Sequence, residues 1–272
     1  MTDATLNGNA ITTLPHAVAE ADAYAKGIGG NVTMSRALAE SAHGLSLNEA
    51  RVMMLAMRCI DPRTSPYKYT KNVGDSVKVR VTAAEFAELA ELEPDENGYT
   101  NRAAYEGLKK ACERLYERSA SWTEGRKEIR MRWVYKAIYH AHEAWAEICF
   151  SPDMTQHIFM LSEKYVRFRL GFAQGLRSIY STNLLRLLMT QRDTGFKTIT
   201  LEDYRKIMEV PASYKYADIK RYAITAPVKE LNDKADMFIE WSETKKGRAV
   251  HSLQFRFHFQ KAPGKAQKAF EF

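Results

Sequence analysis

The stretch of this chain that decides the fold runs from residue 214 to residue 259. It begins Tyr214-Lys-Tyr-Ala-Asp-Ile-Lys-Arg-Tyr222 and ends Glu243-Thr-Lys-Lys-Gly-Arg-Ala-Val-His-Ser-Leu-Gln-Phe-Arg-Phe257. The first part has the pattern of a basic amphipathic helix. The second part alternates like a β-hairpin, and cations flank its turn at 244–247. A winged helix places such a helix in the major groove and such a hairpin against the backbone, so the stretch predicts a DNA-binding module.

An internal repeat extends this prediction to the first half of the chain. Residues 82–92 and 200–210 both open with a capping box and continue with large apolar residues at the same helical offsets. Each follows a strand-like run and precedes a basic helix and an alternating segment, which spans 129–150 in one copy and 237–259 in the other. The matched order predicts two copies of one module.

The predicted fold class is α+β, with two tandem winged-helix domains related as an internal repeat. A chain of 272 residues, 45% of them apolar, is long enough for two such domains with two modest cores. We expect a flexible N-terminal segment at 1–30, a first winged-helix domain at 31–151, connecting helices at 152–180, a second winged-helix domain at 181–260, and a flexible tail at 261–272.

The first module is predicted in more detail. Its helices are expected at 34–42, 46–60, 82–91 and 101–119, and its strands near 67–72 and 77–81. A hairpin follows that turns either at 124–125 or at 140–143, and the sequence leaves both turns open.

Composition agrees with a polyanionic partner such as double-stranded DNA. The net charge is +7 and the pI is 9.2. Cys59, Cys112 and Cys149 form no C-x-x-C pair, which predicts neither a disulfide framework nor a zinc site and fits a reducing bacterial cytoplasm. No apolar run approaches the roughly 20 residues that span a bilayer, and no signal peptide is visible, so no membrane partner is expected.

Four short segments carry a resemblance to a known family: Ala217-Asp-Ile-Lys-Arg221, Lys229-Glu-Leu-Asn232, Lys245-Lys-Gly-Arg248 and Phe255-Arg-Phe257. From about residue 35 to residue 259 the chain resembles the initiator replication proteins of iteron-containing plasmids, which have two winged-helix domains. Two positions depart from the family pattern. Tyr222 stands in place of a further arginine, and Pro227 lies inside the recognition helix, where it predicts a kink or a break.

The resemblance implies a monomer that binds directly repeated DNA sites, the iterons, at a plasmid origin. Bound monomers would help to open an AT-rich segment and recruit host replication proteins, namely the helicase and the host initiator. Homodimers formed through the first domain would bind an inverted repeat and repress the initiator's own gene, a role in plasmid copy control. The predicted surface for self-association lies between residues 46 and 81.

The DNA-binding candidates are the cations on the two predicted helices and hairpins. Arg221 is the candidate for base reading, because arginine can contact guanine O6 and N7 together. Lys215 and Lys220 beside it are expected to contact bases or phosphates, with Tyr222 next to them. The hairpin-tip candidates for phosphate contacts are Lys245, Lys246 and Arg248. In the first module the candidates are Arg102, Lys109, Lys110 and Arg114 on the helix, and Arg126, Lys127, Arg130 and Arg132 for the DNA backbone.

Two other functions stay open at this point: a tandem winged-helix transcription regulator without a role in replication, and a rolling-circle nickase. The pair His140-Ala-His142 is the only motif for the nickase, and it has no further ligands at a recognised spacing. No G-x-x-x-x-G-K-[ST] motif is present, so we expect neither ATP hydrolysis nor a cofactor, and no enzymatic activity.

The tail carries one further motif. Gln267, Phe270 and Phe272 resemble the short peptides that bind the bacterial replication sliding clamp. In those peptides a glutamine bonds at the pocket edge and two apolar side chains fill the pocket. This spacing makes the clamp a candidate partner.

Overall fold

The structure is a computed structural model, and it describes residues 29–60, 77–94, 96, 102–140, 143–158 and 165–259. Its elements, in chain order, are β1 (Asn31–Ser35), α2 (Arg36–Ala39), α3 (Leu47–Arg58), β2 (Lys78–Thr82), α4 (Ala83–Ala90), α5 (Arg102–Leu115), β3 (Ser119–Glu124), β4 (Lys127–Arg132), β5 (Val134–His140), β6 (Trp145–Phe150), η2 (Pro152–His157), β7 (Tyr165–Arg169), η3 (Leu170–Ala173), α6 (Ile179–Met189), β8 (Phe196–Thr200), α7 (Leu201–Ile207), α8 (Tyr216–Asp218), η4 (Ile219–Thr225), α9 (Ala226–Lys234), β9 (Met237–Lys246) and β10 (Ala249–Phe259).

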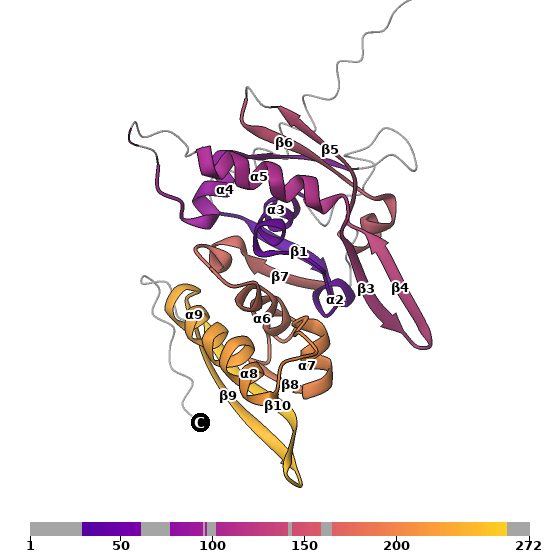
Figure 1. Ribbon diagram of the computed structural model, residues 1–272, viewed down its shortest axis with the longest axis vertical. Helices are drawn as coiled ribbons and strands as arrows, with labels where there is room; N and C mark the ends of the chain where they lie inside the picture. The colour runs from indigo at the N-terminus through magenta and orange to yellow at the C-terminus, as the bar shows by residue number, and fades with distance from the viewer. Residues whose placement is uncertain are drawn as a thin grey trace, which may run out of the picture.

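The two modules share one topology. In the first, β2 pairs with β6 and β6 with β5; in the second, β8 pairs with β10 and β10 with β9 (Figure 1). The helices also correspond: α3 with α6, α4 with α7, and α5 with the helix formed by α8, η4 and α9. This order of a helix, a strand, two helices and a hairpin confirms the predicted pair of winged helices.

The predicted capping box is complete at Thr82, where the Glu85 carboxylate also accepts the Thr82 N–H at 2.8 Å, whereas at Thr200 only the side-chain half of the box is formed. The Glu85 N–H donates to Thr82 Oγ1 at 3.2 Å, and the Asp203 N–H donates to Thr200 Oγ1 at 3.1 Å. Shortly after each helix a glutamate has the left-handed conformation, Glu91 at φ 50° and Glu209 at φ 53°. Since few residues other than glycine adopt this conformation, the matched pair supports the internal repeat down to the backbone.

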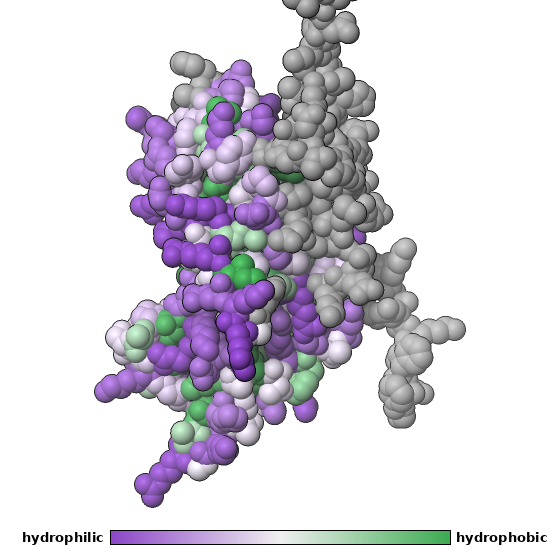
Figure 2. Space-filling view, turned by 90° about the vertical axis from the view of Figure 1, so that its right-hand side faces the viewer, coloured by the Kyte–Doolittle hydropathy of each residue, from purple (hydrophilic) through white to green (hydrophobic). Residues whose placement is uncertain are grey.

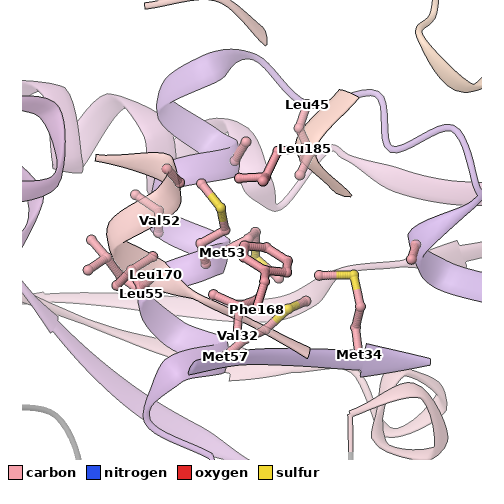
Figure 3. Packing of buried hydrophobic residues seen from close by; sticks show 14 of the residues in the cluster. Val32, Met34, Leu45, Val52, Met53, Leu55, Met57, Phe168, Leu170 and Leu185 are labelled. Atoms are coloured by element: carbon pink, nitrogen blue, oxygen red, sulfur yellow. The ribbon is translucent and has the colours of Figure 1, made fainter. Parts of the chain in front are cut away.

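One continuous hydrophobic cluster joins the two modules, in place of the two separate cores expected from composition. Its centre is α3, which packs against the β1–β7 pair and against α6 (Figure 3). Met53 and Met57 of α3 lie beside Phe168 of β7, and Leu185 of α6 closes the cluster. Because α6 is buried along most of its length, its few polar side chains need partners from other elements.

Several predicted elements differ from the structure. The predicted connecting helices at 152–180 are wrong at 165–169, where β7 pairs antiparallel with β1. The predicted helix at 34–42 is wrong at its start, because Ser35 is the last residue of β1 and caps the short α2. The predicted helix at 101–119 ends at Leu115. Both candidate turns exist, because β3–β4 and β5–β6 are two separate hairpins.

Other predictions fall where the structure gives no description. The expected N-terminal segment (except residues 29 and 30), the strand near 67–72 and the tail at 261–272 lie outside the described residues. No helix in the described part of the chain is long and apolar enough to cross a membrane.

Candidate nucleic-acid interface

The recognition helix of the second module is continuous but changes its hydrogen-bond pattern midway. η4 is π-helical, and at its end the N–H of Ala226 donates to the carbonyl of Arg221, five residues earlier. Pro227 follows in the first turn of α9 and has no N–H for the carbonyl of Ala223, four residues earlier. The buried hydroxyl of Tyr204 donates to that carbonyl at 2.6 Å. The irregularity predicted at Pro227 is therefore a π-helical segment, and the helix does not break.

This helix buries one side and exposes its cations on the other. Ile219, Ala223 and Ile224 lie in the core. The predicted residues on the opposite side, Lys215, Lys220, Arg221 and Tyr222, are all exposed. The Arg221 guanidinium lies 5.2 Å from the centre of the Tyr222 ring. At this distance the guanidinium can make a cation–π contact with the ring.

The wing is the long hairpin β9–β10, which protrudes from the body of the molecule (Figure 1). Gly247 turns the chain at φ 65°, a conformation that suits glycine. Lys245, Lys246 and Arg248 surround this turn and are exposed, as predicted. In the view of Figure 2 the lower end of the molecule, where the hairpin tip lies in Figure 1, is a hydrophilic protrusion.

The helix and the wing meet at a carboxylate that the sequence analysis missed. Glu243 of β9 accepts a short hydrogen bond from the Tyr216 hydroxyl. It also accepts one from Lys220 Nζ at 3.2 Å, and Lys245 Nζ lies 3.7 Å from its other oxygen. The hydrogen bonds from Tyr216 and Lys220 lower the pKa of Glu243. The alternation of β9, which points Ile239, Trp241 and Glu243 to the helix side, was the signal in the sequence.

The basic helix of the first module, α5, mixes charges of both signs. Arg102, Lys110 and Arg114 are exposed and Lys109 is half-buried. Glu106 and Glu113 lie among them in the sequence of this helix. Because of this mixture, α5 should attract a polyanion less strongly than the recognition helix of the second module does.

The densest cations of the first module lie on the hairpin β3–β4. Arg126, Lys127 and Arg130 are exposed there. Arg132 is held at the base, where it donates to the carbonyl of Tyr116 at 2.5 Å and lies 3.5 Å from the Glu117 carboxylate. This hairpin has no counterpart in the second module, whose wing corresponds to β5–β6. The residues predicted to contact the DNA backbone therefore lie on an additional hairpin, which protrudes from the body in Figure 1.

Polar contacts fix the two modules against each other. Arg186 of α6 is buried and donates to the carbonyls of Leu38 and Ser41, both at 3.0 Å, and also to the His43 ring. Burial and the nearby Arg186 hold the pKa of His43 well below its usual value. The Glu209 carboxylate accepts the His43 N–H at 2.6 Å. The candidate DNA-binding surfaces of both modules are therefore parts of one body.

Two family models match this chain. The model described as initiator replication protein, WH1, matches residues 31–189, and the model described as initiator Rep protein, WH2, matches residues 200–257. The chain belongs to the initiator replication protein family. It is a plasmid replication initiator that binds DNA through winged-helix domains, as the resemblance implied. The WH1 match continues through residue 189, past the predicted domain boundaries at 151 and 181. Those two boundaries stay predictions.

One solved structure has a similar fold. The initiator is similar to the Pi initiator protein in complex with iteron DNA, with a TM-score of 0.69, 18% identity, and coverage of 86% of this chain and 98% of that chain. A further match is the MSBI1.176 WH1 domain, a replication protein isolated from a multiple sclerosis patient, at 27% identity and a TM-score of 0.25 over 40% of this chain and 76% of that one.

The described residues form no site with the remaining candidates. In the described part of the initiator no group of three His, Cys, Asp or Glu side chains is placed to hold a metal ion. His140 stacks on Trp145 with ring centres 3.4 Å apart, and His142 lies outside the described residues. The clamp candidates Gln267, Phe270 and Phe272 also lie outside them.

Proposed function

We propose that the second module reads one part of a repeated origin site in the major groove. Arg221 contacts guanine, while Lys215 and Lys220 contact neighbouring bases or phosphates. Lys246 and Arg248 at the wing tip hold the phosphate backbone. The observation that supports this most is the junction at Glu243, where cations of the helix and the wing converge on one surface.

The first module contacts a second part of the same site through the DNA backbone. Arg126, Lys127 and Arg130 on the protruding hairpin β3–β4 make these contacts, and α5 contributes less because its charges are mixed. The fixed interface between the modules supports a defined spacing between the two sets of contacts. The Pi initiator protein, which has a similar fold, was solved in complex with iteron DNA.

In this proposal the monomer binds direct repeats, opens the origin and recruits the host helicase machinery, with the sliding clamp as a further partner of the tail. A dimer formed through the first module represses the initiator's own gene. A footprint over the DNA that flanks the gene tests the central claim. Protection of direct repeats supports replication initiation, whereas protection of an inverted repeat alone supports a transcription regulator. A metal-dependent nick in supercoiled origin DNA supports the nickase.

Two substitutions separate base reading from phosphate binding. We expect Arg221→Ala to reduce affinity for the repeat by about 1–3 kcal/mol while changing affinity for random DNA little. We expect Lys246→Ala to weaken binding to both DNAs equally and to reduce the salt slope by about 0.9. Fluorescence anisotropy with both duplexes at several salt concentrations measures both effects. An equal loss on both DNAs for Arg221→Ala would contradict its role in base reading.

A further inference from the structure

Glu243 occupies an unusual position for an acidic residue on a surface that binds a polyanion. Its side chain is 22% exposed, whereas the two lysines that contact it, Lys220 and Lys245, are 49% and 59% exposed. One lysine comes from the recognition helix and the other from the wing. The carboxylate therefore neutralises cations on both DNA-contacting elements at the point where they meet.

Two further contacts keep these groups in place. The Tyr216 hydroxyl, one helical turn before Lys220, donates a short hydrogen bond to Glu243. Lys220 Nζ also lies 5.4 Å from the centre of the Trp241 ring, which faces the helix from the same side of β9. The neutral Tyr216 hydroxyl thus holds the carboxylate in position even when a lysine moves away from it.

We propose that Glu243 is a specificity-determining residue that withholds Lys220 and Lys245 from the phosphates of non-cognate DNA. On any duplex, a phosphate must displace the carboxylate before it gains either lysine. On the cognate repeat, base contacts of the recognition helix seat the helix deeply enough to offset that displacement. On random DNA no such contacts form, so the two ion pairs persist. The inference rests on the proposed placement of DNA against the helix and the wing.

A purely structural role for Glu243 makes the opposite prediction. If the residue served only to tie the helix to the wing, its removal would loosen both elements and weaken binding to every duplex. Glu243→Gln separates the two roles, because glutamine still accepts the hydrogen bond from Tyr216 but carries no charge. The role in specificity predicts stronger binding to random DNA, and the structural role predicts weaker binding.

Glu240 offers a matched control on the same strand. Like Phe238, Glu240 lies on the exposed face of β9, away from the helix. Its cross-strand neighbour is Arg256. Glu240→Gln changes the net charge of the full chain by the same amount as Glu243→Gln. A general effect of charge would therefore appear in both variants.

The test compares the full-length wild type and both variants on a cognate repeat and a random duplex at 50–200 mM salt. Two released lysines steepen the salt slope on random DNA by up to about 1.8, which is about a tenfold larger loss of affinity over that fourfold range of salt. We expect this change for Glu243→Gln, together with a several-fold lower ratio of specific to random affinity. Glu240→Gln should leave the slope and the ratio unchanged.

Neighbouring lysines on the wing give a second test that leaves Glu243 in place. Lys245→Gln should leave the salt slope on random DNA near the wild-type value, because that lysine is already paired. Lys246→Gln should reduce the slope by about 0.9. Equal effects of the two substitutions, or identical behaviour of Glu243→Gln and Glu240→Gln, would overturn the inference while leaving the proposed function intact. A wild type that does not prefer the repeat over random DNA would instead refute the proposed function.

Discussion

Removing the hydroxyl of Tyr204 should destabilise the recognition helix of the second module. The Tyr204 side chain is buried, and its hydroxyl donates to the Ala223 carbonyl at 2.6 Å, beside the position where Pro227 lacks an N–H. Its ring packs against Phe255, with centres 5.8 Å apart. Tyr204→Phe keeps the ring and its packing, so the substitution deletes one hydrogen bond and leaves no large cavity.

The magnitude follows from the burial of both partners. Ala223 is also inaccessible, so water cannot replace the lost donor. Leaving such a carbonyl unsatisfied costs about 1–3 kcal/mol of the free energy of unfolding. For a chain of this length, each kcal/mol lowers the melting temperature by about 2–4 °C. Urea titration followed by circular dichroism measures the loss directly.

Tyr222→Phe is the matched control, because Tyr222 is 44% exposed and the structure shows no hydrogen bond from its hydroxyl to the described residues. We expect this variant to stay within about 0.5 kcal/mol of the wild type. Tyr204→Phe should also reduce specific DNA affinity, because η4 carries Arg221. Equal stability of the two variants would refute the reasoning, since it would mean that the Ala223 carbonyl has another adequate donor.

Two further predictions concern backbone strain and pH. Gly195→Ala should cost clearly more stability than Gly125→Ala, because both glycines have φ near 60° but a Cβ at Gly195 would lie 2.6 Å from the Phe257 carbonyl oxygen and one at Gly125 would meet nothing; thermal melts compare the two. Because the pKa of His43 is lowered in the folded state, its contribution to stability is complete above about pH 6.5 and is lost as the pH falls, by up to about 1.4 kcal/mol per unit. His43→Gln should flatten the stability profile between pH 7 and pH 5, whereas substitution of the exposed His258 should not.

The winged helices were predictable from the sequence because their signals are local. Capping boxes, apolar residues at helical spacing and a glycine turn between cations each span a few residues. The pair β1–β7 was not predictable for the opposite reason. Residues 165–172 fit a helical spacing, yet Tyr165–Arg169 also alternates, with Val166 and Phe168 buried. Only pairing with β1, more than a hundred residues earlier, decides between the two periods.

The candidate DNA-binding residues were predictable as to place but not as to partners. A run such as Lys245-Lys-Gly-Arg248 predicts an exposed basic turn, and the structure places it there. Whether a lysine in that run is free or paired depends on which side of the strand it occupies and on what packs opposite. Glu243 accepts hydrogen bonds from Tyr216 and Lys220, which are more than twenty residues away in the sequence, so its role could not be predicted from its neighbours in the chain.

The matched glutamates at the ends of α4 and α7 connect the internal repeat to the arrangement of the modules. Glu209 of the second module accepts N–H donors from His43 and Gly44 of the first. Glu91 lies 3.8 Å from Lys234 of the second module, so each copy reaches across to the other from the same position of the repeat. The closer contact uses backbone donors, which fix direction as well as distance. The proposed function needs a fixed offset between the surface that reads bases and the surface that contacts the DNA backbone, and these reciprocal contacts supply one.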